Sequence, residues 1–251
     1  MTVSAPIDIF IGWDPREAEV ADVCAYSILR RTDPGAVRIR YLRLPDLRER
    51  GLYTRQCERR EGRLWDVISE APMSTEFAIS RFLVPILADS EWALFCDCDF
   101  LWQADVRQLI ALADPDRALM CVKHEHKPPE ERKMDGQAQL LYARKNWSSL
   151  VLWNVRHPAH RSLTPEVVNS VPGRDLHRFF WLTDEAIGGL PEGWNWLEGH
   201  SSEAVEPKAI HYTRGGPWFT EWAGVAHADR WLAEREAFLA SRSGGTPATV
   251  R

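Results

Sequence analysis

The feature that most constrains the fold is an apolar run at residues 92–96 that leads directly into two carboxylates, Asp97 and Asp99. A short apolar run of this kind predicts a buried strand. Successive residues of an extended chain point to opposite sides, so Asp97 and Asp99 project on the same side. Open α/β sheets bind ligands outside the carboxyl ends of their strands. Two carboxylates this close repel each other, so a hard divalent cation with oxygen ligands is the expected partner.

Strand and helix patterns alternate along the chain, which predicts an α/β fold with a mostly parallel, Rossmann-like central sheet flanked by helices. Helices are expected after the N-cap Asp14, with Pro15 and Glu17 in the first turn, and after Ser74. Apolar and alternating runs predict strands at 7–11, 37–41, 92–96, 118–122 and 150–153, and further helices at 106–112 and 228–239. The length fits a single domain over 1–240, followed by a disordered tail at 241–251.

Composition argues against several classes of protein. The formal net charge of −5 argues against a nucleic-acid binder, whose affinity would come from neutralising phosphates. No stretch reaches the roughly 20 apolar residues of a membrane span, and residues 1–6 lack the pattern of a secretion signal. The odd count of five cysteines fits reduced thiols, so we expect a cytoplasmic protein. The helix at 228–239 carries Trp231 and Phe238, which leaves peripheral contact with the inner face of a membrane open.

Six separated segments of the chain share an order and spacing that is specific in combination. They are a strand and turn at 9–14, a helix with an arginine at 80–85, Asp-x-Asp at 94–99, a Trp-Ser-Ser segment at 146–154, an acidic pair at 184–185 followed by 190–195, and His-Tyr-x-x-Gly-Gly-Pro-Trp at 211–218. In this combination the chain, from about Ile7 to Trp218, resembles the retaining glycosyltransferases of the GT-A fold. The resemblance is to the glycogenin and galactosyltransferase group, family 8.

The resemblance implies a GT-A-type fold and the transfer of a hexosyl group from a UDP-sugar, with retention, to a glycan, lipid-linked sugar or protein. It implies Mn²⁺ or Mg²⁺ as cofactor, bound by Asp97, Asp99 and His211, and a nitrogen ligand favours Mn²⁺. Asp184 and Glu185 would act at the reacting centre. The nucleotide-sugar would contact Gly12, Trp13, Asp14, Arg81, Asp97, Cys98, Ser148, Ser149, Arg214, Gly215 and Gly216.

Three positions depart from the family pattern, and all three are expected near the donor sugar. Gly216 stands where the family has a lysine for the diphosphate, so Arg214 is the candidate to replace it. Trp147-Ser148-Ser149 stands for Asn-Ser-Gly, and Glu185 stands for glutamine. The donor sugar, the acceptor and the carboxylate that acts at the anomeric carbon therefore stay open.

Most of the candidate residues also have a structural explanation. The Asp-x-Asp pattern fits a solvated turn, and the glycines fit ordinary turns. The remaining structural alternatives are a core or surface histidine for His211, a helix cap for Asp14, a surface ion pair for Arg81 and a helix start for Asp184 and Glu185. Two structural explanations are favoured over the functional ones: a solvated charged loop for Lys123, His124, His126, Lys145 and Asn146, and aromatic core packing for Trp194, Trp196 and Trp218.

Three other functions compete with glycosyl transfer. A sugar-nucleotidyltransferase shares this type of sheet but should have a glycine-rich phosphate loop ending in a basic residue after the first strand, and residues 12–15 do not form one. A phosphatase of the Asp-x-Asp type should carry its first aspartate near the N-terminus. A tryptophan-rich carbohydrate-binding protein without turnover is the third alternative.

Overall fold

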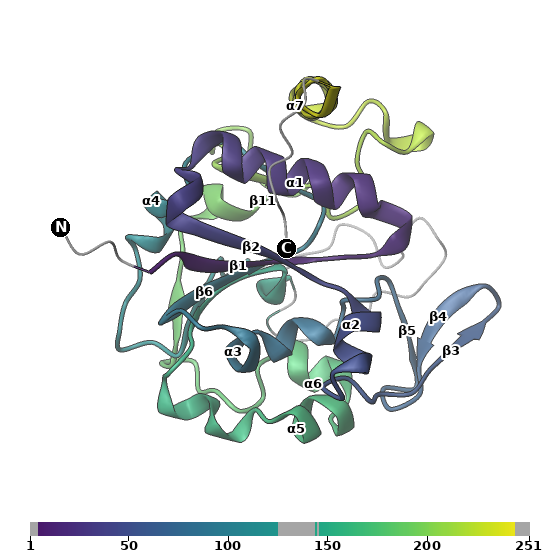
Figure 1. Ribbon diagram of the computed structural model, residues 1–251, viewed down its shortest axis with the longest axis vertical. Coiled ribbons are helices and arrows are strands. Elements are labelled where there is room, and N and C mark those ends of the chain that lie inside the picture. The colour runs from purple at the N-terminus through teal and green to yellow at the C-terminus, as the bar shows by residue number, and fades with distance from the viewer. Residues whose placement is uncertain (1–4, 125–143, 145, 244–251) are drawn as a thin grey trace.

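The computed structural model describes residues 5–124, 144 and 146–243 (Figure 1). A central sheet of six strands has the order β10-β8-β9-β6-β1-β2. Its strands are β1 (Ile7–Gly12), β2 (Val37–Leu42), β6 (Trp92–Cys96), β8 (Leu119–Cys121), β9 (Leu150–Asn154) and β10 (Ile187–Gly189). The strands that the sequence predicts at 7–11, 37–41, 92–96, 118–122 and 150–153 are confirmed to within about one residue at each end.

The central sheet is mostly parallel, as the alternating pattern predicts. β1 pairs in parallel with β2 and β6, and β8 pairs in parallel with β10. β9 lies between β6 and β8 and is antiparallel to both, so the other five strands share one direction. Their carboxyl ends therefore meet at one edge of the sheet, where α/β folds place their ligands.

Helices cover both faces of the central sheet (Figure 1). α1 (Ala18–Arg31) lies on one face, and α7 (Ala228–Ser243) lies over α1. The buried Trp231 and Glu234 face inward from α7, and Glu234 accepts from Arg31 at 2.7 Å. The other face carries α3 (Val84–Leu87), α5 (Pro165–Ser170) and α6 (Gly173–His177), and the remaining short helices are α2 (Leu44–Glu49) and α4 (Arg107–Ile110).

A second sheet of three short strands joins distant parts of the chain. Its order is β11-β12-β7, with β11 (Trp196–Leu197), β12 (Ala209–His211) and β7 (Phe100–Trp102). β12 is antiparallel to β7, and the register sets His211 opposite Phe100. β7 follows β6 after a short turn that contains Asp97 and Asp99. The second sheet therefore brings residue 211 to the carboxyl end of β6.

The third sheet, β3 (Cys57–Arg60), β4 (Arg63–Asp66) and β5 (Ala71–Met73), is antiparallel, and its β3–β4 hairpin projects from the body of the molecule (Figure 1). A buried ion pair holds its base. Arg55 donates through Nε and Nη2 to the carboxylate of Asp66, at 2.7 and 2.6 Å, and through Nη1 to the main-chain carbonyls of Val168 and Val171. Both charged side chains of the pair are fully buried, so this contact fixes the hairpin against α5.

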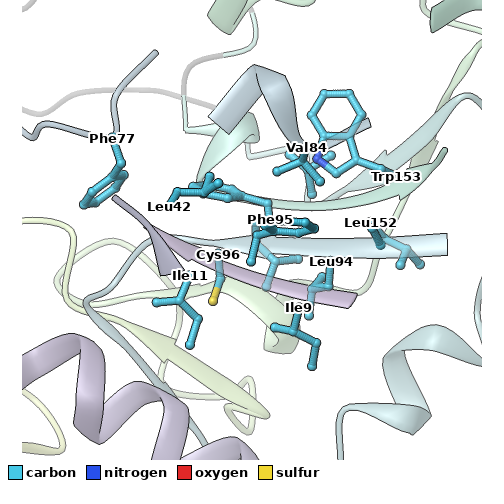
Figure 2. Close-up of a cluster of buried hydrophobic side chains, with 14 of the residues drawn as sticks. Ile9, Ile11, Leu42, Phe77, Val84, Leu94, Phe95, Cys96, Leu152 and Trp153 are labelled. Carbon is cyan, nitrogen blue, oxygen red and sulfur yellow. The ribbon is translucent and has the colours of Figure 1, made fainter. Parts of the chain in front are cut away.

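The hydrophobic core lies on both sides of the central sheet. Ile9 and Ile11 of β1 and Leu94 and Cys96 of β6 are all fully buried (Figure 2). Strands buried on both faces read as continuous apolar runs rather than as alternating ones, and β6 has this pattern. Within the described residues, no helix is long and apolar enough to cross a membrane.

Two helical segments differ from the sequence expectation. The helix expected directly after Ser74 begins later, as a 3₁₀ turn over Ser80–Leu83 followed by α3, and Ile86 is exposed. Pro85 cannot donate a main-chain hydrogen bond, which explains why no longer α-helix forms across it. At the other end, α7 continues to Ser243, and residues 244–251 of the expected tail lie outside the described part of the chain.

Candidate functional site

The structure brings Asp97, Asp99 and His211 together at the carboxyl edge of the central sheet. One potential ligand atom from each lies within 4.8 Å of the others. His211 Nε2 is 3.3 Å from Asp99 Oδ1, and the main-chain N–H of Tyr212 donates to the carbonyl of Asp99 at 3.1 Å. The pairing of β12 with β7 produces this contact. Two oxygen ligands and one imidazole nitrogen form a set that fits a divalent cation such as Mn²⁺.

Asp97 carries a carboxylate that the surrounding structure makes costly to ionise. Burial raises the pKa of Asp97 to about 6, and the negative charge of Asp99 acts in the same direction, while Arg81 opposes both. The Nη1 atom of Arg81 is 2.7 Å from Asp97 Oδ1. Two neighbouring acids with one cationic partner leave a negative site that a bound cation would stabilise.

Arg81 is buried, so the alternative of a surface ion pair is wrong. Its side chain donates to the carbonyls of Ala78 and Ser148, at 3.0 and 2.9 Å, besides its ion pair with Asp97. These contacts hold Arg81 under the carboxylate of Asp97. Its position therefore supports Asp97 directly.

A cavity of about 460 Å³ lies on the same edge of the central sheet as the three-residue cluster. None of the three cluster residues lines it, but Leu197, which does, pairs with His211 between β11 and β12. The cavity lies at the carboxyl ends of β8 and β10, and polar side chains from several segments line it: Lys123, His124, Asn146, Glu192, His200 and Ser201. Burial lowers the pKa of His124 to about 4, and the nearby His211 and His200 act in the same direction. Lys123, His124 and Asn146, for which a solvated loop was favoured, lie outside helices and strands and line the cavity; Lys123 is exposed, and the other two are half-buried. His126 and Lys145 lie outside the described residues.

The acidic pair expected at the reacting centre lies elsewhere. Asp184 and Glu185 precede β10, whereas the cavity is lined by residues at the carboxyl end of that strand. Asp184 is exposed and forms an ion pair with Arg144 at 2.5 Å. The carbonyl of Glu185 accepts from Arg117, which precedes β8. The geometry thus does not support a role at the reacting centre for this pair, and Glu192 is the carboxylate found among the cavity-lining residues that the structure describes.

The turn after β1 is built mainly by structural contacts. Asp14 is fully buried, and its two oxygens accept from the main chain and side chain of Arg16 and from the main-chain N–H of Glu76. Asp14 thus caps the following turn, which confirms the structural role that the sequence allowed for it. A Cβ at Gly12 would lie 2.3 Å from the ring of Phe77, so glycine is required there for packing. Trp13 is half-buried, with the guanidinium of Arg43 4.6 Å from its ring centre.

Cys98, Ser148 and Ser149, all expected to contact the donor, are buried and engaged within the protein. Cys98 Sγ lies 3.8 Å from a carboxylate oxygen of Glu17. Ser148 Oγ is 2.7 Å from Nδ1 of the buried His177. Ser149 Oγ donates to the carbonyl of Asn146 at 2.9 Å. Each of these three side chains therefore has a partner within the protein.

Arg214, Gly215 and Gly216 follow β12, and Arg214 has a strong partner of its own. Its Nη2 atom is 2.7 Å from a carboxylate oxygen of the buried Glu198. Gly199 has φ +72°, and a Cβ there would lie 2.0 Å from Arg214 Nη2. A Cβ on Gly216 would similarly meet the ring of Trp218 at 2.0 Å. The position of Arg214 against Glu198 therefore depends on the glycine at position 199. Arg214 contacts Glu198 through Nε and Nη2, and its Nη1 takes no part in this contact.

Two residues near the cluster, Glu17 and Asn195, were not predicted from the sequence to belong to the site. Glu17 was expected to serve as a capping residue, but it has no capping hydrogen bond. Burial raises the pKa of Glu17 to about 7, and the negative charges of Asp99 and Asp14 act in the same direction. Asn195 is fully buried, and its Oδ1 lies 3.0 Å from Nδ1 of His211. No local pattern marks either residue, because their neighbours come from distant segments.

The expected aromatic packing is confirmed for all three tryptophans. Trp194 and Trp196 are almost fully buried. Trp218 is half-buried, with its ring centre 5.0 Å from that of Trp231 on α7. The surface around the cavity therefore owes its polar character to the histidine, lysine, asparagine and serine side chains.

Comparison with known proteins identifies the family of the chain. No protein-family model matches it. Protein CDI of Arabidopsis thaliana is 47% identical over 239 residues, which cover 93% of this chain and 87% of that protein. The chain belongs to the Protein CDI family. The similarity spans the segments that carry the cluster of Asp97, Asp99 and His211.

Similar solved structures show the fold of this member of the Protein CDI family. The apo structure of the bifunctional glycosyltransferase WbbM matches with a TM-score of 0.60 at 15% identity, over 94% of this chain and 50% of that one. The glycosyltransferase GlyE of Streptococcus pneumoniae TIGR4 matches with a TM-score of 0.59 at 12% identity, over 99% of this chain and 66% of that one. The chain thus spans about half the length of the first structure and about two thirds of the second.

A third solved structure matches over nearly its whole length. Galactosyltransferase LgtC, in complex with donor and acceptor sugar analogs, has a TM-score of 0.54 at 17% identity, over 92% of this chain and 96% of that one. These identities are low, so the three structures establish the fold alone. The predicted GT-A-type fold is confirmed: a mostly parallel central sheet flanked by helices.

Proposed function

We propose that this protein is a nucleotide-sugar-dependent glycosyltransferase with a divalent cation at Asp97, Asp99 and His211. The observation that carries the proposal is the position of this cluster, at the carboxyl edge of a GT-A-type sheet that also holds a polar cavity of about 460 Å³. Ligand sites of open α/β sheets lie at this edge. Cavities of this volume fit small ligands.

The donor atoms present fit a cation that also binds phosphate oxygens. Carboxylates suit Mg²⁺ and Mn²⁺, and an imidazole nitrogen favours Mn²⁺. A cation bound there would supply Lewis-acid stabilisation to a departing diphosphate. Arg81 would hold the Asp97 carboxylate in place during binding, because its guanidinium is fixed by the carbonyls of Ala78 and Ser148.

The cavity would receive the sugar. Lys123, Asn146 and Ser201 provide hydrogen-bond donors, and Glu192 provides an acceptor for sugar hydroxyls. His124 would be neutral at pH 7, because burial lowers its pKa to about 4, and neutral imidazole both donates and accepts. A sugar bound by these groups would lie on the same edge of the sheet as the proposed cation, which would stabilise the charge of the departing diphosphate.

The finer features of the proposal follow from the resemblance to family 8. They are a UDP-hexose donor, retention of configuration, and a carbohydrate, glycolipid or protein acceptor. A cytoplasmic location, with peripheral membrane contact open, is also proposed. The alternatives are a sugar-nucleotidyltransferase and a carbohydrate-binding protein without turnover.

Release of UDP from UDP-glucose and UDP-galactose tests the proposal. We expect release with Mn²⁺, its loss with a chelator, and a loss of at least about a hundredfold in Asp99→Asn, since removing a transition-state electrostatic contact typically costs that much. Asp114→Asn is the matched control, because Asp114 precedes β8 and pairs with the half-buried Arg117, away from the three-residue cluster.

Two further measurements separate the alternatives. Formation of nucleotide-sugar from a sugar phosphate and UTP would identify a nucleotidyltransferase. Binding of sugars or nucleotide-sugars without turnover, across a panel of acceptors, would identify a carbohydrate-binding protein. Either result would overturn the proposed transfer reaction.

A further inference from the structure

The second ring nitrogen of His211 has a buried partner that bears on the proposed cation site. Nδ1 of His211 lies 3.0 Å from Oδ1 of Asn195, while Nε2 faces Asp99. Asn195 is fully buried, and His211 is almost fully buried. The His211 ring also stacks on Phe100, with centres 4.4 Å apart and an interplanar angle of 18°. The ring therefore has one well-defined orientation.

A chain of hydrogen bonds determines which nitrogen of His211 carries the proton. The chain ends at the main-chain carbonyl of Asn146, which can only accept. Ser149 Oγ donates to that carbonyl at 2.9 Å, and so accepts from Nδ2 of Asn195 at 3.0 Å. The amide of Asn195 then presents its oxygen to His211. Because an amide oxygen only accepts, the proton of neutral His211 lies on Nδ1 and the lone pair lies on Nε2.

Ser149 also connects this chain to the other half of the cluster. Its main-chain carbonyl accepts from the N–H of Asp97 at 3.0 Å. Ser149 thus holds the main chain at Asp97. Through its hydrogen bond with Asn195 it also holds the ring of His211. The donors of the cluster come from the turn after β6 and from β12, which are distant in sequence, and residues 149 and 195 bridge them.

We propose that Asn195, supported by Ser149, is a positioning residue that keeps His211 in the tautomer with a bare Nε2 and so sets the affinity of the site for a divalent cation. This inference rests on the proposed cation site and adds residues outside the three ligands. Partners of this kind fix ring orientation and tautomer in metal sites, and their loss typically weakens metal binding by about 10–100-fold.

Titration of the purified full-length protein with Mn²⁺, followed by the electron paramagnetic resonance signal of free Mn²⁺, tests the proposal without any turnover. We expect Asn195→Leu to weaken Mn²⁺ binding by about 10–100-fold. Asn195→Asp keeps an acceptor for the Nδ1 proton and should stay within about threefold of the wild type, since a carboxylate commonly takes this place. Ser149→Ala should fall between the two.

A control and a second readout separate positioning from general damage to the fold. Asn154→Leu removes another largely buried amide of the central sheet, at the end of β9 that pairs with the start of β6, and should leave Mn²⁺ affinity unchanged. Long-range ¹H–¹⁵N spectra of the histidine rings should show the proton of His211 on Nδ1 in the wild type, and a loss of this preference in Asn195→Leu.

Each outcome has a distinct meaning. Wild-type Mn²⁺ affinity in Asn195→Leu, or a proton on Nε2 of His211 in the wild type, would overturn the role of Asn195. Absence of Mn²⁺ binding by the wild type would overturn the proposed cation site and with it the effect of Asn195 on affinity. The tautomer measurement distinguishes these failures, because it does not require a metal.

Discussion

At the scale of single residues, what a polar side chain can do depends on which partners already satisfy it. The oxygens of Asp14 are occupied by Arg16 and Glu76, so a residue expected at the nucleotide serves as a cap. Asp97 and Asp99 keep two acidic groups close to one imidazole, with Arg81 as the cationic partner of Asp97. The candidate cation site is therefore indicated by carboxylates whose negative charges are not fully neutralised by cationic partners, and not by the most exposed carboxylates.

Placement of the carboxylates around the cavity predicts a clear difference between variants. Both Glu192 and Asp184 are exposed, but Glu192 lines the cavity, whereas Asp184 precedes β10 and pairs with Arg144. If Glu192 accepts hydrogen bonds from the sugar, Glu192→Gln should lower kcat/KM for the donor by about 10–100-fold, since a hydrogen bond to a charged group contributes about 1.5–3 kcal/mol.

Asp184→Asn is the matched control and should change kcat/KM by less than about threefold, because surface substitutions are usually within about 0.5 kcal/mol. Steady-state UDP release measures both variants. A large loss in Asp184→Asn with little effect in Glu192→Gln would show that the acidic pair acts at the reacting centre and that Glu192 does not contact the sugar.

Residue spacing predicts part of this site and misses the rest. The two-residue spacing of Asp97 and Asp99 on an extended chain is enough to expect them on one side. His211 was expected from a motif, because no spacing relates it to residue 97. Asn195 and Glu17 could not be predicted, since their roles arise from the pairing of β7 with β12 and the packing of the turn at 15–17 against the cluster.

At the scale of elements, the long apolar runs were predictable and the short strands were not. β6 is continuous apolar sequence, and its bounds match the expectation. β7, β11 and β12 have three, two and three residues, too few for a period to be recognised. The β3–β4 hairpin is largely charged, so it lacks the apolar signal of a strand. The pairing of β7 with β12 positions His211, and Asp66 of β4 anchors the hairpin through its ion pair with Arg55.

The buried ion pair at the base of the hairpin predicts a large stability effect. Arg55→Met would leave Asp66 as an uncompensated buried charge, with the carbonyls of Val168 and Val171 losing their donor. Removing one partner of a buried pair costs about 3–5 kcal/mol. We expect a loss of that size in the free energy of unfolding, measured by urea titration.

Arg59→Met, on the exposed part of the same hairpin, is the control and should change the free energy of unfolding by less than about 0.5 kcal/mol. Equal stability of the two variants would show that the Arg55–Asp66 pair does not anchor the hairpin. The slope of the urea dependence should stay unchanged in both, because the surface exposed on unfolding is nearly the same.

At the scale of the whole molecule, several histidines are buried in neutral form, and this makes the fold sensitive to acid. Burial lowers the pKa of His160 to about 4 and that of His177 to about 3. In the unfolded chain these histidines are protonated with a pKa of about 6.5. Between about pH 6.5 and pH 4 the unfolded chain therefore binds protons that the folded state does not bind. Stability contributed by the neutral histidines is therefore complete above about pH 6.5 and is lost as the pH falls toward 4.

The loss is large enough to measure for one residue. For His160 the difference in pKa corresponds to about 2 kcal/mol between pH 7 and pH 5. His160→Gln keeps a donor for the carbonyl of Ala118, which His160 Nε2 contacts at 2.8 Å, and has no titrating group. The free energy of unfolding of this variant should therefore fall about 2 kcal/mol less than that of the wild type over this range. If the free energy of unfolding fell equally in His160→Gln and in the wild type between pH 7 and pH 5, this would contradict the buried neutral state of His160.

The central claim is that Asp97, Asp99 and His211 form a cation site that holds the diphosphate of a sugar nucleotide beside the cavity. A crystal structure with Mn²⁺ and UDP, with anomalous scattering to locate manganese, tests this most directly. We expect the manganese peak within coordination distance of both carboxylates and of Nε2 of His211, with the UDP phosphates on the same ion. A manganese peak elsewhere, or UDP bound away from this edge of the sheet, would contradict the claim.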